Sequence, residues 1–146
     1  LESKRDSLET WVSADNIYFK IEEGKILETA GLINNLTSYV RNDFQLFDPT
    51  YEEERIFNAY YSYDEPELNN LEVKSTLIYK GKEELDLLIG RKQLFVFQEN
   101  IFNEYLNWKA ANKYWVDEDG FVWKSLQHIS TKLPPIEIEI RKKPAD

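Results

Sequence analysis

The amino-acid sequence predicts an all-β protein, an antiparallel meander that forms a barrel-like or sandwich sheet with at most one or two short helices. Short runs of alternating apolar and polar residues recur along the chain, and turn residues separate them. No period of about 20 to 50 residues repeats, which disfavours a solenoid or a propeller. The alternation indicates a sheet with one buried and one solvated face.

The beginning of the chain is typical of a three-stranded meander. Thr10 to Ala14, Asn16 to Glu22 and Lys25 to Thr29 favour strands, with a first break at Asp15-Asn16. The turn before Lys25 contains Gly24, which adopts a positive φ without steric cost. We therefore expect a tight hairpin at Gly24.

The next stretch predicts the best helix candidate and a loop. Asn34 to Arg41 places Leu36, Tyr39 and Val40 at helical spacing, and an Asn at its start is a suitable cap. Asn42 to Arg55 is irregular and acidic, which is typical of a solvated surface connection.

The middle of the chain returns to the β pattern. A strand is expected from Ile56 to Tyr63, with a break at Asp64-Glu65-Pro66. Glu72 to Lys80, a turn at Gly81-Lys82 and the alternation of Leu85, Leu87 and Ile89 predict a hairpin, followed by a strand from Gln93 to Gln98. Glu99 to Trp108 fits neither period.

A third hairpin is predicted near the end of the chain. Lys113 to Val116 and Phe121 to Ile129 flank an acidic Asp117-Glu118-Asp119-Gly120 turn, and Asp-Gly between such runs is a strong hairpin signal. Simple alternation places Phe121, Trp123 and Ser125 on one face, which we expect to be buried. Ile136 to Ile140 alternates strictly with charged residues and predicts a further half-buried strand.

Length and charge limit the function classes. A chain of 146 residues is long enough for one domain with a sizeable core, so a single domain over residues 1–146 is expected. The net charge of −9 repels phosphate backbones and disfavours a nucleic-acid partner. Without Cys there are no disulfides or thiolate metal sites, and the redox compartment stays open between cytosol and periplasm. No apolar run has the length of a membrane span.

No constellation predicts a catalytic, metal or cofactor site. Asp117, Glu118 and Asp119 are the densest carboxylate cluster beside aromatic residues, but neighbouring turn carboxylates point apart, which weakens a hydrolytic interpretation. The only His, His128, is expected to have its ring nitrogens satisfied locally. No nucleophile elbow, P-loop or dinucleotide-binding glycine motif is present.

The aromatic residues offer a second interpretation, since their rings pack well against the apolar faces of sugars. Most of them are expected in the core. The candidate contacts for a glycan or a partner protein are Tyr114, Asp117, Glu118, Asp119, Trp11 and Trp108.

Two ordered blocks of sequence carry a family resemblance. The run from Asn112 to Gln127 (NKYWVDEDGFVWKSLQ), followed by Leu133 to Ile140 (LPPIEIEI), resembles the C-terminal signature of the GfcB/YjbF family of bacterial lipoproteins. Trp11 to Asp15 (WVSAD), Gly24 to Leu32 (GKILETAGL) and Asn35-Leu36 resemble its N-terminal signature. The stretch between, about residues 37–92, matches weakly.

The resemblance implies a Gram-negative outer-membrane lipoprotein that faces the periplasm and takes part in the production of group 4 capsule or another exopolysaccharide. It places a signal peptide, a lipidated Cys and a first strand before Leu1, so the lipid anchor is expected outside this chain. The predicted function is non-enzymatic: the domain assists polysaccharide export or assembly by binding glycan or a capsule-secretion protein. The alternatives are a glycan-modifying hydrolase using Asp117 and Asp119, and a lipid-binding carrier.

Overall fold

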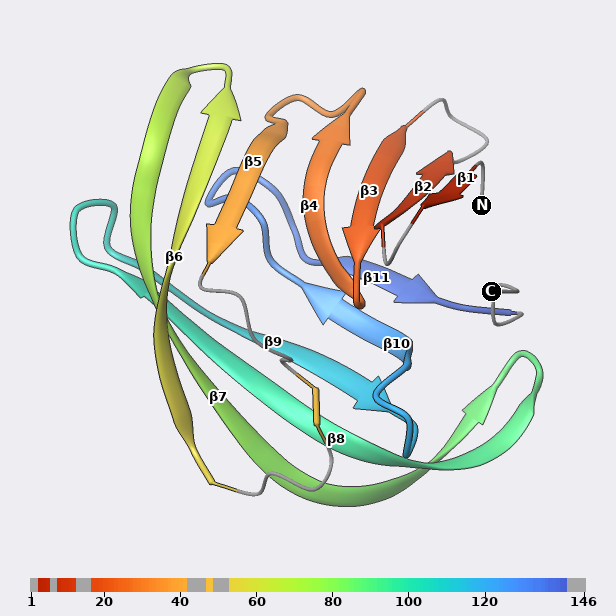
Figure 1. Cartoon of the computed structure of the whole chain (residues 1–146). Coiled ribbons are helices and arrows are strands. Elements are labelled where there is room, and N and C mark those ends of the chain that lie inside the picture. Colours follow the sequence, from red (N-terminus) through yellow and green to blue (C-terminus); the bar gives the residue numbers. More distant parts are fainter. Residues whose placement is uncertain (1–2, 6–7, 13–16, 42–46, 49–52, 142–146) are drawn as a thin grey trace.

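The computed structural model describes residues 3–5, 8–12, 17–41, 47–48 and 53–141 (Figure 1). Its regular elements are all β-strands, which confirms the predicted fold class. The strands are β1 (Ser3–Arg5), β2 (Leu8–Val12), β3 (Tyr18–Glu22), β4 (Lys25–Ala30), β5 (Leu36–Arg41), β6 (Arg55–Asp64), β7 (Glu67–Leu87), β8 (Gly90–Asn103), β9 (Trp108–Val116), β10 (Val122–Gln127) and β11 (Ile136–Glu139).

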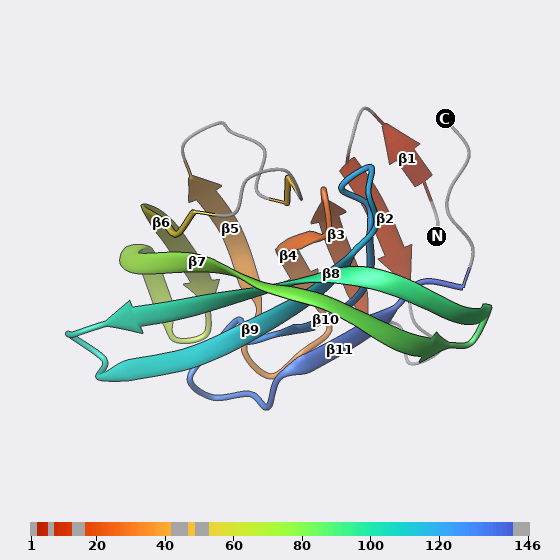
Figure 2. The same cartoon turned by 90° about the horizontal axis from the view of Figure 1, so that it is seen from below.

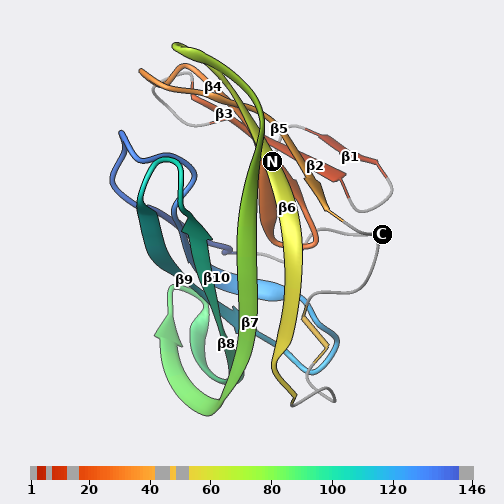
Figure 3. The same cartoon turned by 90° about the vertical axis from the view of Figure 1, so that its left-hand side faces the viewer.

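The strands form two antiparallel meanders. One sheet has the order β1-β2-β3-β4, and the other has the order β11-β10-β9-β8-β7-β6-β5. The larger sheet curls, with β6 and β7 linking the side near the smaller sheet to β8–β10 (Figures 1 and 3). Its long strands β7 and β8 cross the whole width of the molecule (Figure 2).

The β3–β4 hairpin joins the two ends of this curled sheet. On one side, the Leu36 amide of β5 donates to the Thr29 hydroxyl of β4 at 3.0 Å. On the other side, the Ile26 amide of β4 donates to Gln127 Oε1 of β10 at 3.1 Å, and Gln127 Nε2 donates to the Gly24 carbonyl at 2.8 Å. The hairpin thus bridges β5 and β10, which are five strands apart in the sheet order.

The prediction of a helix from Asn34 to Arg41 is wrong. Residues from Leu36 onward form β5, which pairs with β6, and the register shifts between Leu36 and Ser38. A bulge adds one residue to the alternation, so the buried side chains of Leu36 and Tyr39 are three positions apart. That spacing resembles a helical face, and it explains the error.

The predicted turn at Gly81-Lys82 is also wrong. Gly81 lies within β7, at a register shift between Tyr79 and Gly81, and the chain reverses at Leu88-Ile89 instead. Both turn residues are apolar and exposed, so the sequence carries no polar turn signal there. The ambiguous stretch from Glu99 to Trp108 contains the end of β8, the next turn and the start of β9.

The other predicted elements agree with the structure within a few residues. Breaks at Gly24, at residues 64–66 and at residues 117–120 are confirmed, as is the strand that begins at Ile136. The strand predicted from Phe121 to Ile129 is shorter at both ends. Two predictions fall largely outside the described residues. These are the end of the first predicted strand with its break, at residues 13–16, and most of the predicted loop from Asn42 to Arg55.

The core has two parts on opposite faces of the larger sheet. Along β8, Phe97 belongs to the main core cluster and its neighbour Val96 belongs to the second, because side chains alternate across a strand. Ile21 and Ile26 of the smaller sheet pack in the main cluster with Phe97. The smaller sheet therefore covers the concave face of the larger one; the single-domain organisation stays a prediction.

The second cluster corrects the face predicted for β10. A register shift between Val122 and Lys124 places Trp123 with Trp115 in the second cluster, whereas Val122 lies in the main one. Ser125 is buried and pairs with Tyr114 of the main cluster. Simple alternation fails because a bulge changes which residues share a face.

Candidate functional site

The acidic turn between β9 and β10 is organised by Asp117. Gly120 N donates to the Asp117 carbonyl at 3.0 Å and Asp117 N donates to the Phe121 carbonyl at 2.9 Å, while Gly120 has φ 85°. A left-handed glycine after a turn is the usual third residue of a three-residue hairpin loop. The Asp117 carboxylate also accepts from Asp119 N at 2.9 Å, Phe121 N at 3.0 Å and Trp123 Nε1 at 3.0 Å.

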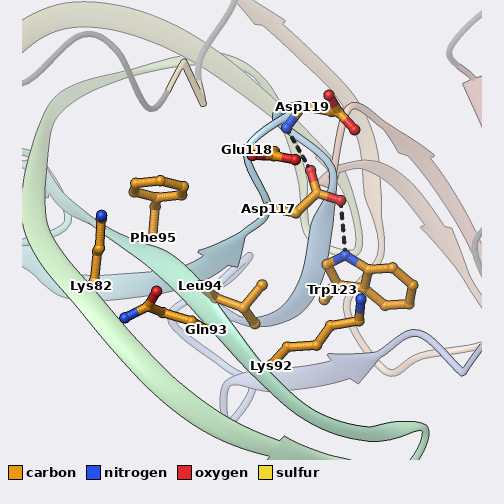
Figure 4. Close-up of a pocket in the computed structure, with 9 residues that line it drawn as sticks. All are labelled: Lys82, Lys92, Gln93, Leu94, Phe95, Asp117, Glu118, Asp119 and Trp123. Atoms are coloured by element: carbon orange, nitrogen blue, oxygen red, sulfur yellow. Dashed lines mark hydrogen bonds between the residues drawn. The ribbon is translucent and has the colours of Figure 1, made fainter.

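This turn forms one wall of a pocket of about 640 Å³, which we call the tip pocket. Figure 4 shows the turn above β8, with Lys82 and Phe95 together on one side and Lys92 beside Trp123 on the other. The lining residues are Lys82, Lys92, Gln93, Leu94, Phe95, Asp117, Glu118, Asp119 and Trp123.

The tip pocket combines opposite charges with an aromatic surface. Lys82 Nζ lies 5.5 Å from the centre of the half-buried Phe95 ring, and Lys92 Nζ lies 4.6 Å from the centre of the Trp123 ring. Such distances are those of cation–π contacts. Glu118 and Asp119 are exposed at the turn and offer hydrogen-bond acceptors, whereas the lysines and Gln93 offer donors. This arrangement suits a polar ligand with many hydroxyl groups and an apolar face.

Asp117 is committed to the turn. Its carboxylate accepts hydrogen bonds from two backbone amides and from an indole N–H. Both oxygens therefore hold the loop and Trp123 in place. A general acid or base must instead direct an oxygen toward the reacting group. The geometry therefore gives Asp117 an organising role.

Two of the predicted contact residues lie in the core. Tyr114 has no exposed surface, and its hydroxyl donates to Glu99 Oε1 at 2.7 Å. Trp108 is buried with its ring edge-on to Tyr61, the centroids 5.7 Å apart. Neither side chain is at the surface, because alternation points both toward the concave face. The side chain of Trp11 lies outside the described residues, while Asp117, Glu118 and Asp119 meet in the tip pocket.

Sequence reasoning missed a buried polar cluster on that concave face. Lys25 and Glu99 are 2% and 1% exposed, and Lys25 Nζ lies 2.9 Å from Glu99 Oε1. The same oxygen accepts from Asn112 Nδ2 at 2.9 Å and from the Tyr114 hydroxyl. Lys25 Nζ is also within 3.5 Å of the Tyr61 hydroxyl. The signal lay in the alternation of β8, where Glu99 falls on the face of Phe97 and Ile101.

The electrostatics of this cluster favour a charged Glu99. Burial by itself raises the pKa of the carboxyl, but the Lys25 charge and the hydrogen bonds from Asn112, Lys25 and Tyr114 outweigh it and hold the pKa below its ordinary value. Burial, and then the Glu99 charge, raises the pKa of the Tyr61 and Tyr114 hydroxyls well above the usual value, so both stay protonated.

His128 lies just after β10, and a local partner is seen for one of its two ring nitrogens. Its backbone amide donates to Asn112 Oδ1 at 2.7 Å, and its Nδ1 lies 3.0 Å from the same oxygen. Burial, and then the charge of Lys25, lowers the pKa of its imidazole. Among the described residues, no group of three or more His, Cys, Asp or Glu side chains is placed to hold a metal ion.

The remaining residues of the tip pocket could not be found from spacing. Lys82 belongs to β7, and Lys92, Gln93 and Phe95 belong to β8, so the pocket depends on the β7–β8 register and on the β9–β10 turn reaching over it. None of these residues forms a motif in the linear sequence.

In the described part of the chain, no helix has the length and apolar character that crossing a membrane requires.

Comparison with known proteins gives a structural relative. The chain is similar to the crystal structure of the hypothetical lipoprotein YmcC from Escherichia coli K12, with a TM-score of 0.85, 22% sequence identity and alignment over 99% of this chain and 76% of that one. At this identity the likeness shows the fold. No curated protein matches the sequence.

The sequence itself matches a family over nearly its whole length. Residues 1–140 match the family described as group 4 capsule polysaccharide lipoprotein GfcB, YjbF. The match includes the middle of the chain, where the resemblance from quoted residues is weak. The description is that of an envelope lipoprotein and names no reaction. The chain therefore belongs to the YjbF family of group 4 capsule polysaccharide lipoproteins.

Proposed function

We propose that this protein is a non-enzymatic domain that assists capsule or exopolysaccharide export or assembly by binding the glycan in the tip pocket. The observation that carries the proposal is the pocket itself, about 640 Å³ in volume and lined by carboxylates, lysines, an amide and the Phe95 ring. Ligand pockets of this size class have a few polar groups that fix orientation beside an apolar surface. Sugars present both kinds of group.

Family membership supports a place and a process for this activity. Membership in a group of capsule polysaccharide lipoproteins supports a location at the outer membrane, facing the periplasm, with attachment through an N-terminal lipid. Components of the secretion machinery are the protein partners that this position would offer.

Two alternatives receive less support from the geometry. A hydrolase using Asp117 and Asp119 would need Asp117 free for the reaction, but that carboxylate holds the turn and Trp123. A lipid carrier would need an apolar cavity on the concave face. Packed side chains fill that face, among them the charged Lys25 and Glu99.

The test is a titration of the purified protein with capsule oligosaccharides. Binding is measured by calorimetry and by the shift of the Trp123 indole signal in NMR spectra. Saturable binding is expected, and Gln93→Ala and Glu118→Ala should each weaken it by about tenfold, the cost of roughly one lost hydrogen bond in a desolvated site. Glu104→Ala is the matched control, because Glu104 is exposed at the β8–β9 turn.

The proposal fails if capsule oligosaccharides do not bind, or if both pocket variants bind as well as the unaltered protein. Cleavage of the oligosaccharide during the titration would instead support the hydrolase. Capsule output from cells carrying Asp119→Ala separates these cases further, since loss of output with unchanged glycan binding would contradict a pure binding role.

A further inference from the structure

The outer face of the larger sheet carries an aromatic ring between two lysines. Lys74 of β7 is directly opposite Phe102 of β8, and Phe102 is directly opposite Lys109 of β9. Their chain neighbours Ser75 and Ile101 are buried against the core, so alternation directs Lys74 and Phe102 outward. We call these three residues the outer row.

The next row of the same face is polar and small. Thr76, Asn100 and Ala111 are paired across the same three strands. Gln98 Nε2 donates to Asn100 Oδ1 at 2.8 Å, which fixes the orientation of the Asn100 amide. The two rows line an open groove of about 490 Å³.

The charge of this groove is opposite to that of the protein. The whole chain has a net charge of −9, yet the groove lining contains Lys74 and Lys109 and no carboxylate. Elsewhere on this face Lys113 and Lys124 lie near Glu83 and Glu137, at 3.8 Å and 3.2 Å. Neither Lys74 nor Lys109 forms a salt bridge with the described residues. Two cations on both sides of one groove attract an anion.

The exposed ring adds an apolar contact between these cations. Phe102 is 37% exposed, and Lys109 Nζ lies 5.7 Å from the ring centre. The Lys74 and Lys109 backbones are two strand spacings apart, about 9.6 Å, so a ligand that covers Phe102 reaches both ammonium groups. Thr76 and Asn100 then face its hydroxyl groups.

We propose that the outer row and the groove beside it form a second binding site, which takes an acidic saccharide, with a sugar ring on Phe102 and carboxylates at Lys74 and Lys109. At the groove β7 and β8 are paired on both sides, so a β-strand of a protein partner could add only beside residues 108–112 of β9, which among the described strands pair with β8 alone. A membrane surface is the other ligand that the test has to separate, because the adjoining β8–β9 turn exposes Tyr105 and Leu106. The site is independent of the tip pocket.

The test uses the 146-residue chain, isotope-labelled for NMR, and trigalacturonate as the probe. Saturable binding is expected, with shifts at the amides of Thr76, Asn100 and Ala111 and with weaker binding at higher salt. Lys74→Gln/Lys109→Gln should weaken binding by about tenfold or more, because charge-assisted hydrogen bonds are lost. Phe102→Leu keeps an apolar side chain of similar size without the flat ring, and it should weaken binding about fivefold.

Three controls decide the result. Lys124→Gln, an ion-paired lysine on the same face, should bind within about twofold of the unaltered protein. The carboxyl-reduced trisaccharide should bind at least about tenfold more weakly. Glu118→Ala, in the tip pocket, should leave trigalacturonate binding at the outer row unchanged, so failure here and failure of the proposed function are separate outcomes.

Several results would overturn the proposal: no binding of trigalacturonate, equal binding of the double lysine variant, or equal binding of the reduced sugar. Comparable affinity for phosphatidylglycerol vesicles or for an acidic peptide, lost in the same double variant, would assign the groove to those ligands instead.

Discussion

Lys25 begins β4 and carries its charge into the core, where it meets Glu99 of β8. Both side chains are almost fully buried, and the rings of Tyr39, Tyr61 and Tyr114 lie within 5.0 Å, 5.9 Å and 5.9 Å of the ammonium group. Removing one partner of a buried ion pair leaves the other charge uncompensated, which costs more than the pair itself contributes. The stability of the fold therefore depends on keeping both charges or removing both.

We predict that Lys25→Met lowers the free energy of unfolding by about 3–5 kcal/mol, because Glu99 then loses its counter-charge. Lys25→Met/Glu99→Gln should recover most of this loss and lie within about 1 kcal/mol of the unaltered protein. In the double variant, the amide oxygen introduced in place of the carboxylate still accepts from Asn112 and Tyr114. Urea denaturation followed by Trp fluorescence measures all three proteins. A double variant as unstable as the single one would contradict this account.

At the scale of elements, the β3–β4 hairpin is packed so closely against β10 that position 24 in its turn has room only for glycine. A Cβ added to Gly24 would lie 2.2 Å from Val122 Cγ2, and Gly24 has φ +83°. Gly81, at the bulge in β7, has φ +101° and nothing within 4 Å of an added Cβ. The two glycines share the positive φ and differ in contact with another strand.

Gly81→Ala is expected to cost about 1–2 kcal/mol, the penalty for an L-residue in the left-handed region. Gly24→Ala should cost about 1–3 kcal/mol more, because the methyl group overpacks the contact with β10. Thermal or urea unfolding of both variants gives the difference. Equal losses of stability in the two variants would mean that the hairpin moves aside for the methyl group and that its contact with β10 contributes no stability.

Elements were predictable where local chemistry decides them. The Asp-Gly turn, the Gly24 turn and the alternating strand from Ile136 depend on neighbouring residues, and all are present. The errors at Leu36, Gly81 and Trp123 each coincide with a register shift. A bulge is set by pairing with a distant strand, so its effect on the alternation is not visible in one strand alone.

The same division applies to the candidate site. Asp117, Glu118 and Asp119 were identified because they adjoin each other in the sequence. Lys82, Gln93 and Phe95 come near them only because of the register of the β7–β8 hairpin, whose first strand is 21 residues long. Tyr114 and Trp108 were candidate contacts because residue type alone does not tell which face of β9 the smaller sheet covers.

At the scale of the whole molecule, buried tyrosines determine the response to alkali. Burial is the first cause of the raised pKa of Tyr39, Tyr61, Tyr63 and Tyr114. The unfolded chain releases these protons near pH 10, the ordinary value, while the folded protein retains them. Their contribution to stability is therefore complete below about pH 10 and is lost as pH rises above it.

We expect the free energy of unfolding to fall steadily above about pH 10 and also to fall below about pH 4. The acid limb follows from Glu99, whose lowered pKa contributes stability above its unfolded value that is lost as pH falls through the folded value. Urea titrations from about pH 3 to about pH 12 test both limbs. Tyr63→Phe should flatten the alkaline one, and an unchanged stability at the alkaline end of this range would refute the assignment.

The strand order has a consequence for how the chain folds. Within each sheet, every strand pairs with its neighbours in sequence, so most of the larger sheet can form through local pairing. The bonds from the β3–β4 hairpin span 74 residues to Glu99 and 101 residues to Gln127. Bringing such distant segments together costs loop-closure entropy before any contact repays it.

Docking of the β3–β4 hairpin across the curled sheet is therefore predicted to come after the rate-limiting step. Gln127→Ala should mainly speed unfolding, with a φ-value near 0, whereas Ile101→Val between β7 and β9 should slow folding. Stopped-flow chevrons distinguish the two, and a φ-value near 1 at Gln127 would reverse the order. On this account the long-range hairpin acts as a kinetic latch that governs how long the folded protein persists rather than how fast it forms.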